Sequence, residues 1–175
     1  MKYGEWDHLH GLVTMSIRDV LASVGIDTRF KGTVATSEIK LAELLSVAGF
    51  GGAMLRGSIA FSVPVALLRR SHPVRGAQDE DLADWLAELT NLLLGQIKRR
   101  LLAKDCLIEV SLPVTLSAPE LRFKSFAGPP AGFVFEAQGD LLHAVFGAVA
   151  AADEVAFSTS PPPVHIADAG EMVTF

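Results

Sequence analysis

The chain has 175 residues, and 50% of them are hydrophobic, which is enough to fill one core of ordinary size. A net charge of −5, a pI near 5.5 and no basic run longer than Lys98–Arg100 argue against a nucleic-acid partner. The single cysteine, Cys106, excludes an internal disulfide, and the polar start MKYGEWDHLHG lacks the apolar stretch of a signal peptide. The longest apolar run, Leu141–Ala152, is far shorter than the ~20 residues of a spanning helix. We therefore expect a cytoplasmic protein with no membrane partner.

The first half of the chain predicts a helix followed by strands. Apolar residues recur at helical spacing over Leu9–Val24, and Gly25 follows as a plausible C-cap. From Thr28 to Ser62 the pattern becomes strand-like, and the glycine-rich run Gly49–Gly52 interrupts it where the chain must reverse. We expect an antiparallel hairpin around this turn.

Two further helices are expected in the middle of the chain. Ser62 can cap a short helix that has Pro64 in its first turn and ends before Pro73. After a polar loop, the acidic run Asp79–Asp81 lies where a helix N-terminus favours negative charge, and this helix then runs to about Ala103. It is the longest element predicted.

The last part of the chain predicts strands and a tail. Apolar residues alternate or cluster between proline and glycine breaks in four segments, 107–116, 121–126, 133–137 and 141–150. Three consecutive prolines near the end remove backbone donors and disfavour both helix and central strand. We predict a single α/β (α+β) domain over residues 1–151, with a largely antiparallel sheet packed against the long helix and the N-terminal helix, and a Pro-rich tail over 152–175.

Polar residues follow one face of the long helix. At about 100° per residue, a narrow stripe contains Asp84, Glu88, Asn91, Gly95 and Lys98. The opposite side carries Leu82, Leu86, Leu89, Leu93 and Ile97, and Trp85, Leu92 and Leu94 flank the boundary. Any amphipathic surface helix has a polar face, so the stripe alone does not establish a site. Gly95 costs about 1 kcal/mol relative to alanine, which is tolerable where another backbone must approach, and Asn91 offers a donor and an acceptor.

These residues resemble the signature helix of the CheX family of chemotaxis phosphatases. In DLADWLAELTNLLLGQIKRRL, the family's Asp/Ser, Glu and Asn positions are matched by Asp84, Glu88 and Asn91, and Gly95 matches a glycine common after the Asn. In the following IEVSLPVTL, Pro113 matches the proline of the family's next strand, although its spacing from Asn91 is one residue shorter than the family pattern. The ordered set is more specific than the Glu and Asn alone.

The resemblance covers about residues 9–150, because GAMLRGSIAFSVPVALLRR also resembles the family's preceding strand and short helix. Members of the family hydrolyse the aspartyl phosphate of a receiver-domain response regulator, typically CheY. The resemblance therefore implies a phosphatase whose partner is a phosphorylated CheY-like receiver. It also implies a homodimer in which edge strands of two chains join.

The family's mechanism assigns roles to the stripe. Asn91 would position the attacking water in the receiver's active site, and Glu88 would pair with the receiver's lysine and orient the complex. Asp84, Gly95 and Lys98 are expected on the partner-binding surface, and Asp84 has no catalytic step. No metal site or other cofactor is needed on this chain, because the receiver supplies the Mg²⁺.

Other functions remain open. A non-catalytic receiver-binding module, like the flagellar-switch proteins related to CheC and FliY, would keep the same fold. A small-molecule sensor finds no specific support in the sequence. The five histidines lack a metal-ligand spacing, and Cys106, with no histidine nearby, is expected to be a buried hydrophobe rather than a nucleophile.

Overall fold

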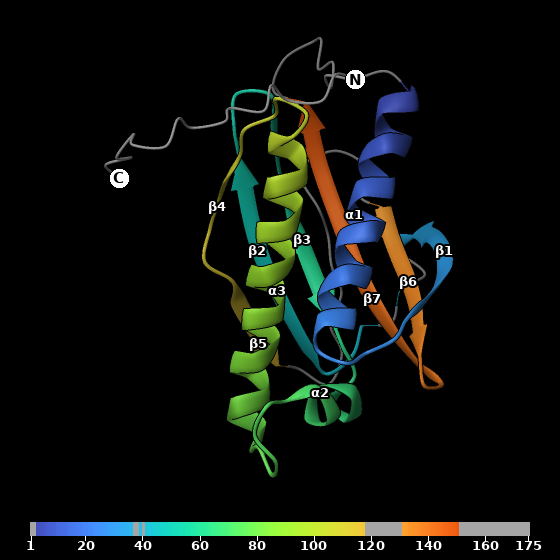
Figure 1. The fold of residues 1–175 in the computed structure, drawn as a ribbon, viewed down its shortest axis with the longest axis vertical. Coiled ribbons are helices and arrows are strands. Elements are labelled where there is room, and N and C mark those ends of the chain that lie inside the picture. The colour runs from blue at the N-terminus through green and yellow to red at the C-terminus, as the bar shows by residue number, and fades with distance from the viewer. Residues whose placement is uncertain (1–2, 37–38, 40, 118–130, 151–175) are drawn as a thin grey trace, which may run out of the picture.

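The computed structural model describes residues 3–36, 39, 41–117 and 131–150. In chain order the elements are α1 (Tyr3–Ser23), β1 (Arg29–Ala35), β2 (Leu44–Gly51), β3 (Leu55–Ser62), α2 (Val65–Ser71), α3 (Asp79–Leu102), β4 (Glu109–Val110), β5 (Val114–Ser117), β6 (Ala131–Ala137) and β7 (Asp140–Ala150). All strand pairs are antiparallel, in the order β1-β6-β7-β3-β2-β4, with β5 also on β2. Helices α1 and α3 lie side by side on one face of the sheet (Figure 1), so the predicted α+β fold is confirmed.

The end of α1 has the predicted glycine cap. Gly25 has a φ of +77°, a left-handed conformation that glycine adopts without a Cβ clash. Its N–H donates to the carbonyl of Ala22 (3.1 Å), and the N–H of Ile26 donates to that of Leu21 (2.9 Å). This pair of bonds is a Schellman motif, and it turns the chain from α1 toward the sheet.

The hairpin is confirmed, but two local predictions around it are wrong. Three residues of the predicted run, Gly49–Gly51, still belong to β2, where Gly51 pairs with Arg56, so only Gly52 of that run lies in the reversal, which continues through Ala53 and Met54. Ser62 does not cap α2; its Oγ accepts from the N–H of Ala42 (2.8 Å) and donates to the carbonyl of Leu44 (3.1 Å). The hydroxyl is used to join the start of β2 to the end of β3, and α2 begins after Pro64 without a side-chain cap.

The segment expected as one strand at 107–116 is divided into β4 and β5. Between the pairs Phe50–Val110 and Val47–Val114, β2 advances by three residues while its neighbour advances by four, so the neighbour contains a bulge. Pro113 has no N–H to donate to β2, which explains why the pairing is interrupted there. The expected strands at 133–137 and 141–150 correspond to β6 and β7, whereas 121–126 and the tail lie outside the described residues.

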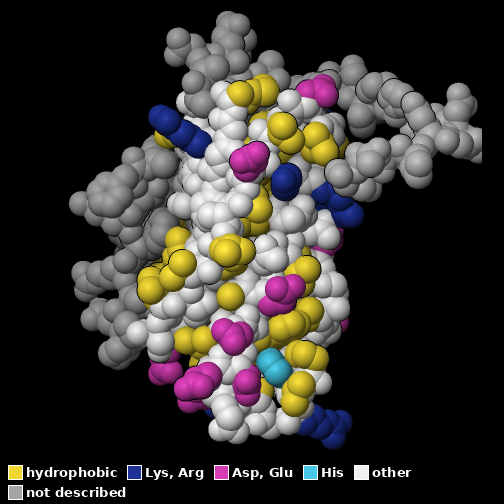
Figure 2. Space-filling model, turned by 90° about the vertical axis from the view of Figure 1, so that its left-hand side faces the viewer, with side chains coloured by type: hydrophobic (Ala, Val, Ile, Leu, Met, Phe, Trp, Pro, Cys, Tyr) yellow, Lys and Arg dark blue, Asp and Glu magenta, His cyan; other side chains and the backbone are white. Residues whose placement is uncertain are grey.

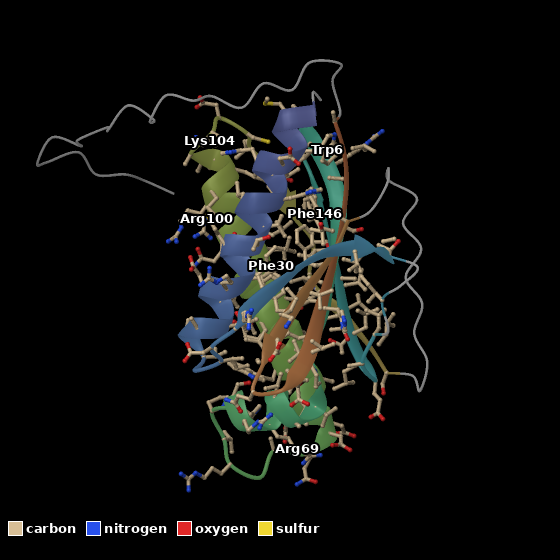
Figure 3. The ribbon with its side chains drawn as sticks, turned by 90° about the vertical axis from the view of Figure 1, so that its right-hand side faces the viewer. Trp6, Phe30, Arg69, Arg100, Lys104 and Phe146 are labelled. Atoms are coloured by element: carbon tan, nitrogen blue, oxygen red, sulfur yellow. The ribbon has the colours of Figure 1, made fainter. Side chains whose placement is uncertain are left out.

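The core lies between the sheet and the two long helices. In Figure 3 the Phe146 side chain lies in this layer, where it stacks on Phe50 with ring centroids 5.4 Å apart. The helices are also joined at their outer edge, because the Arg100 guanidinium donates to Ser16 Oγ (2.9 Å) and to Asp19 on α1. Within the described part of the chain, no helix is both long enough and apolar enough to cross a membrane.

Two partly buried histidines predict how stability depends on pH. Burial lowers the pKa of His10, against the opposing effect of Asp7, and burial also lowers the pKa of His143. Below pH ~6.5 the unfolded chain takes up protons that the folded chain resists, so the free energy of unfolding should fall as the pH drops from 7.5 to 5.5. Urea denaturation at the two pH values measures this. The double variant His10→Gln/His143→Gln should show a flatter dependence, and an unchanged slope would contradict the assignment.

Candidate functional site

Helix α3 is fixed at both ends by local hydrogen bonds. At its start, Asp81 accepts from the N–H of Gln78 (2.7 Å), the reciprocal half of a capping box. At its end, Asp105 adopts a left-handed φ of 58°, and the N–H of Cys106 donates to the carbonyl of Leu101 (3.0 Å). Since both ends are held, the residues between them lie on a rigid element, which suits a site that must present side chains precisely.

The apolar face of α3 sets its rotation about its own axis. Its fully buried apolar side chains are Leu82, Leu86, Leu89, Leu93, Leu94, Ile97 and Leu101. All five leucine and isoleucine positions predicted for the core are therefore confirmed. Of the predicted boundary residues, Leu94 lies in the core, Trp85 is half-buried and Leu92 is 41% exposed.

The polar stripe faces solvent as predicted. Asp84, Glu88, Asn91 and Gly95 are exposed, and Lys98 is half-buried. Among the described residues, none accepts a hydrogen bond from the Asn91 side chain or forms an ion pair with Glu88. One turn apart on the same face, the amide and the carboxylate are thus available to a partner.

Gly95 lies over open space. A Cβ added at this position meets no atom of the described structure within 4 Å, and the backbone is helical. The chain's own packing therefore does not require glycine, although glycine weakens a helix. A close approach by another molecule would explain its presence.

Charge is unevenly distributed along α3. The residues before Asn91 carry five acidic groups, at 79, 80, 81, 84 and 88, and the residues after Ile97 carry three basic groups, at 98, 99 and 100. Between Glu88 and Lys98 no residue is charged. On this side of the molecule (Figure 2), acidic side chains gather toward the end where α3 begins, and hydrophobic side chains lie among them. Asn91 therefore occupies an uncharged stretch between two oppositely charged halves.

The β4–β5 segment borders the stripe on one side. Thr115 Oγ1 donates to the carbonyl of Ala83 (3.1 Å), so β5 runs beside the first half of α3. In the bulge between β4 and β5, Leu112 is 85% exposed, the most exposed large hydrophobic residue described. Sequence reasoning missed this residue, because the sequence predicts one regular strand here, and whether Pro113 interrupts the pairing depends on which strand lies beside it.

Among the described residues, the other candidate groups do not form a metal or nucleophilic site. Cys106 is fully buried, which confirms the prediction of a buried hydrophobe, and burial raises the pKa of its thiol. Within the described ranges, no three His, Cys, Asp or Glu side chains are placed to hold a metal ion. An open groove of ≈ 470 Å³ lies at the start of α3, where Glu43, Arg69 and Asp79 line it together with Leu44, Val65, Glu80, Ala83 and Ser117. Neither Glu88 nor Asn91 lines this groove, so the groove and the polar stripe are separate features of the α3 surface.

No family model and no curated protein matches this sequence. The fold is similar to that of CheX from Vibrio vulnificus, with a TM-score of 0.73 and 17% identity over 81% of this chain and 99% of that one. It is also similar to a CheX–CheY–BeF3–Mg²⁺ complex from Borrelia burgdorferi, with a TM-score of 0.60 and 15% identity over 80% and 94%. For FliY from Thermotoga maritima the TM-score is 0.55 and the identity 14%, over 83% and 90%. The resemblance to CheX drawn from the signature helix is therefore confirmed at the level of the fold.

Two substitutions on α3 test the orientation of the helix. Gly95→Ala should raise the free energy of unfolding by about 0.5–1 kcal/mol, because alanine favours the helix and its methyl group meets open space. Leu93→Ala should lower it by about 2–5 kcal/mol, because it leaves a cavity in the core. Urea unfolding of the two variants and the parent gives both values. A Gly95→Ala protein less stable than the parent would show that this face is not open.

Proposed function

We propose that this protein binds a phosphorylated CheY-like receiver domain through α3 and accelerates hydrolysis of its aspartyl phosphate. The observation that carries the proposal is the exposed pair Glu88 and Asn91, one turn apart on a rigid helix and without partners in the described structure. The fold adds support, since the CheX chain in a complex with CheY, BeF3 and Mg²⁺ has a similar architecture. Beryllium fluoride is an analogue of a phosphoryl group, so that complex resembles the state in which hydrolysis would occur.

Asn91 acts on the water in this proposal. An acyl phosphate is already reactive, so a phosphatase needs chiefly to hold a water in line with the phosphorus. The Asn91 amide presents both a donor and an acceptor, and it does not titrate near neutral pH. Its exposure and its position in the uncharged middle of α3 allow it to enter the receiver's site without bringing a charge toward the phosphoryl oxygens.

Glu88 orients the complex. Its carboxylate has no counter-ion among the described residues, so it can pair with a lysine of the receiver. Asp84, one further turn back, adds negative charge on the same face, and Gly95 permits close approach on the other side of Asn91. The half-buried Lys98 would contact the edge of the partner. The Mg²⁺ that neutralises the phosphoryl oxygens comes with the receiver.

A second function uses the same surface without turnover. The fold is shared with FliY, so a non-catalytic receiver-binding or flagellar-switch module is the alternative. The presence of the Asn91 amide beside Glu88 favours catalysis, because binding alone would need only the charge pair and the surrounding contacts. The two functions differ in whether phosphate is released.

The proposed roles separate Asn91 from Glu88. Asn91→Ala should lower the dephosphorylation rate at saturating phosphorylated receiver by about 10²-fold or more and leave binding nearly intact, because the amide acts mainly in the transition state. Glu88→Ala should weaken binding and also lower turnover, because the lost ion pair helps orient the complex. Release of labelled phosphate measures the rate, and titration of the receiver with BeF3 and Mg²⁺ measures binding.

Controls make this comparison specific. Glu43→Ala removes the same charge from an exposed position outside α3, just before β2, and it should leave turnover close to that of the parent. Asn91→Asp keeps the shape but loses the amide donor, and it should be as inactive as Asn91→Ala. If Asn91→Ala dephosphorylates receivers as fast as the parent, the binding-module function replaces the catalytic one.

We also propose a homodimer joined through a sheet edge. In the described structure β5 ends one side of the sheet, and its outward Val114 and Leu116 are 60% and 46% exposed. An open strand with apolar side chains favours pairing with a second strand. Light scattering at micromolar concentration should give twice the chain mass of 18.7 kDa. A single species of 18.7 kDa would exclude the dimer at that concentration.

A further inference from the structure

The bulge between β4 and β5 is anchored on both sides. Before it, Ser111 exchanges two bonds with Gly49: its N–H donates to the Gly49 carbonyl (2.9 Å), and its Oγ accepts from the Gly49 N–H (2.8 Å). After it, Val114 pairs with Val47, and Thr115 bonds to α3. The side chain of Leu112 therefore projects from a fixed backbone rather than from a free loop.

This bulge lies beside the catalytic turn of α3. Thr115 is bonded to Ala83, and α3 and the β4–β5 segment run in opposite directions (Figure 1). Three extended residues span roughly 10 Å, which equals about seven residues of helix. Leu112 therefore lies level with the turn of α3 that contains Glu88 and Asn91.

A second leucine lies on the opposite flank of the same turn. Leu92 is 100° around the helix from Asn91, on the side away from Ala83 and hence away from the β4–β5 segment. It is 41% exposed, although its neighbours Leu93 and Leu94 are fully buried. Two exposed leucines thus lie on opposite sides of the turn of α3 that carries Glu88 and Asn91. No charged residue of α3 lies between Glu88 and Lys98.

We infer that Leu112 and Leu92 are apolar anchors that seat the receiver domain on either side of Glu88 and Asn91. This inference rests on the proposed function and adds two residues that determine partner affinity and choice. Large exposed leucines on a rigid backbone gain the most from a partner, because they bury apolar area with little loss of conformational freedom. Contacts on both flanks exclude bulk water from the ion pair that Glu88 would form with the receiver, and this desolvation strengthens the binding contact.

The partner that fits this surface has a basic group at its centre and apolar side chains on both sides of it. The acidic half of α3, including Asp84 and Glu88, would face the basic part of the partner. A receiver domain supplies a lysine beside its phosphorylation site. The inference predicts that apolar residues of the receiver border that site on two sides.

The test compares Leu112→Glu and Leu92→Glu with Leu141→Glu in the full chain. Leu141 is 49% exposed and lies at the start of β7, so its substitution makes the same chemical change outside the surface. The probe is a CheY receiver domain loaded with BeF3 and Mg²⁺, titrated calorimetrically. Leu112→Glu and Leu92→Glu should each raise the Kd by about 10- to 100-fold, Leu112→Met should restore most of the affinity, and Leu141→Glu should match the parent.

Rates and mass separate the outcomes. The anchors act in binding, so dephosphorylation at saturating receiver should stay within about twofold of the parent, in contrast to Asn91→Ala. If the parent binds and dephosphorylates the receiver but Leu112→Glu binds equally well, the anchor inference is wrong while the proposed function stands. If Leu112→Glu changes only the mass in light scattering, Leu112 contacts a second copy of the chain and the inference is also wrong. If the parent neither binds nor dephosphorylates any CheY-like receiver, the proposed function itself fails.

Discussion

The rotation of α3 about its own axis is the constraint on which the rest of the site depends. A shift of half a turn would bury Glu88 and Asn91 and expose Leu89 and Leu93 instead. Seven fully buried apolar side chains hold the helix against the sheet, and truncating any one of them to alanine should lower the free energy of unfolding by about 2–5 kcal/mol, so the rotation is strongly determined. Arg100 ties the same helix to α1, and Thr115 ties it to β5. A site built from the remaining face is therefore rigid before any partner arrives.

Rigidity has a direct consequence for the proposed chemistry. A water must be held in line with phosphorus within a fraction of an ångström, and a flexible loop would lose much of that precision. On α3 the two polar side chains add only their own rotamer freedom to a fixed backbone. Since the described structure gives neither of them a partner, docking does not have to break an existing contact. The binding free energy can then be used to orient the receiver against Glu88 and Asn91.

Sequence reasoning predicted most of the fold and the exposed face of α3, because both follow from the regular spacing of apolar residues along the chain. Apolar spacing located α1 and α3, and the same 100° rule separated the buried Leu86 from the exposed Glu88. The sequence-based prediction was wrong at two positions where contacts between distant parts of the chain determine the structure. Ser62 satisfies β2 instead of capping α2, and Leu94 is buried at a position that the pattern placed at the boundary. Neither the partners of the Ser62 hydroxyl nor the burial of Leu94 can be predicted from the neighbouring residues in the sequence.

The bulge at Leu112 illustrates the same limit at the candidate site. Pro113 is visible in the sequence and matches the proline of the family's strand, but its effect depends on β2 being the neighbouring strand, whose carbonyl lacks the N–H that proline cannot donate. Only the register shows that one extra residue is present and that a leucine leaves the sheet there. The signal that could have found it is the combination of Leu112 and Pro113 in an otherwise regular strand, which marks a place where pairing must stop.

The charges along α3 add what the leucines alone cannot provide. Leu92 and Leu112 border the polar pair on two sides in a nearly symmetrical way, so apolar contact by itself would allow a partner to dock in either of two opposite directions along the helix. Acidic residues up to Glu88 and basic residues from Lys98 onward make those directions unequal, because reversing the partner would bring like charges together. In the proposed complex, hydrophobic contact therefore supplies affinity, the charge gradient selects the direction, and the uncharged stretch between them sets the position of Asn91 over the phosphoryl group.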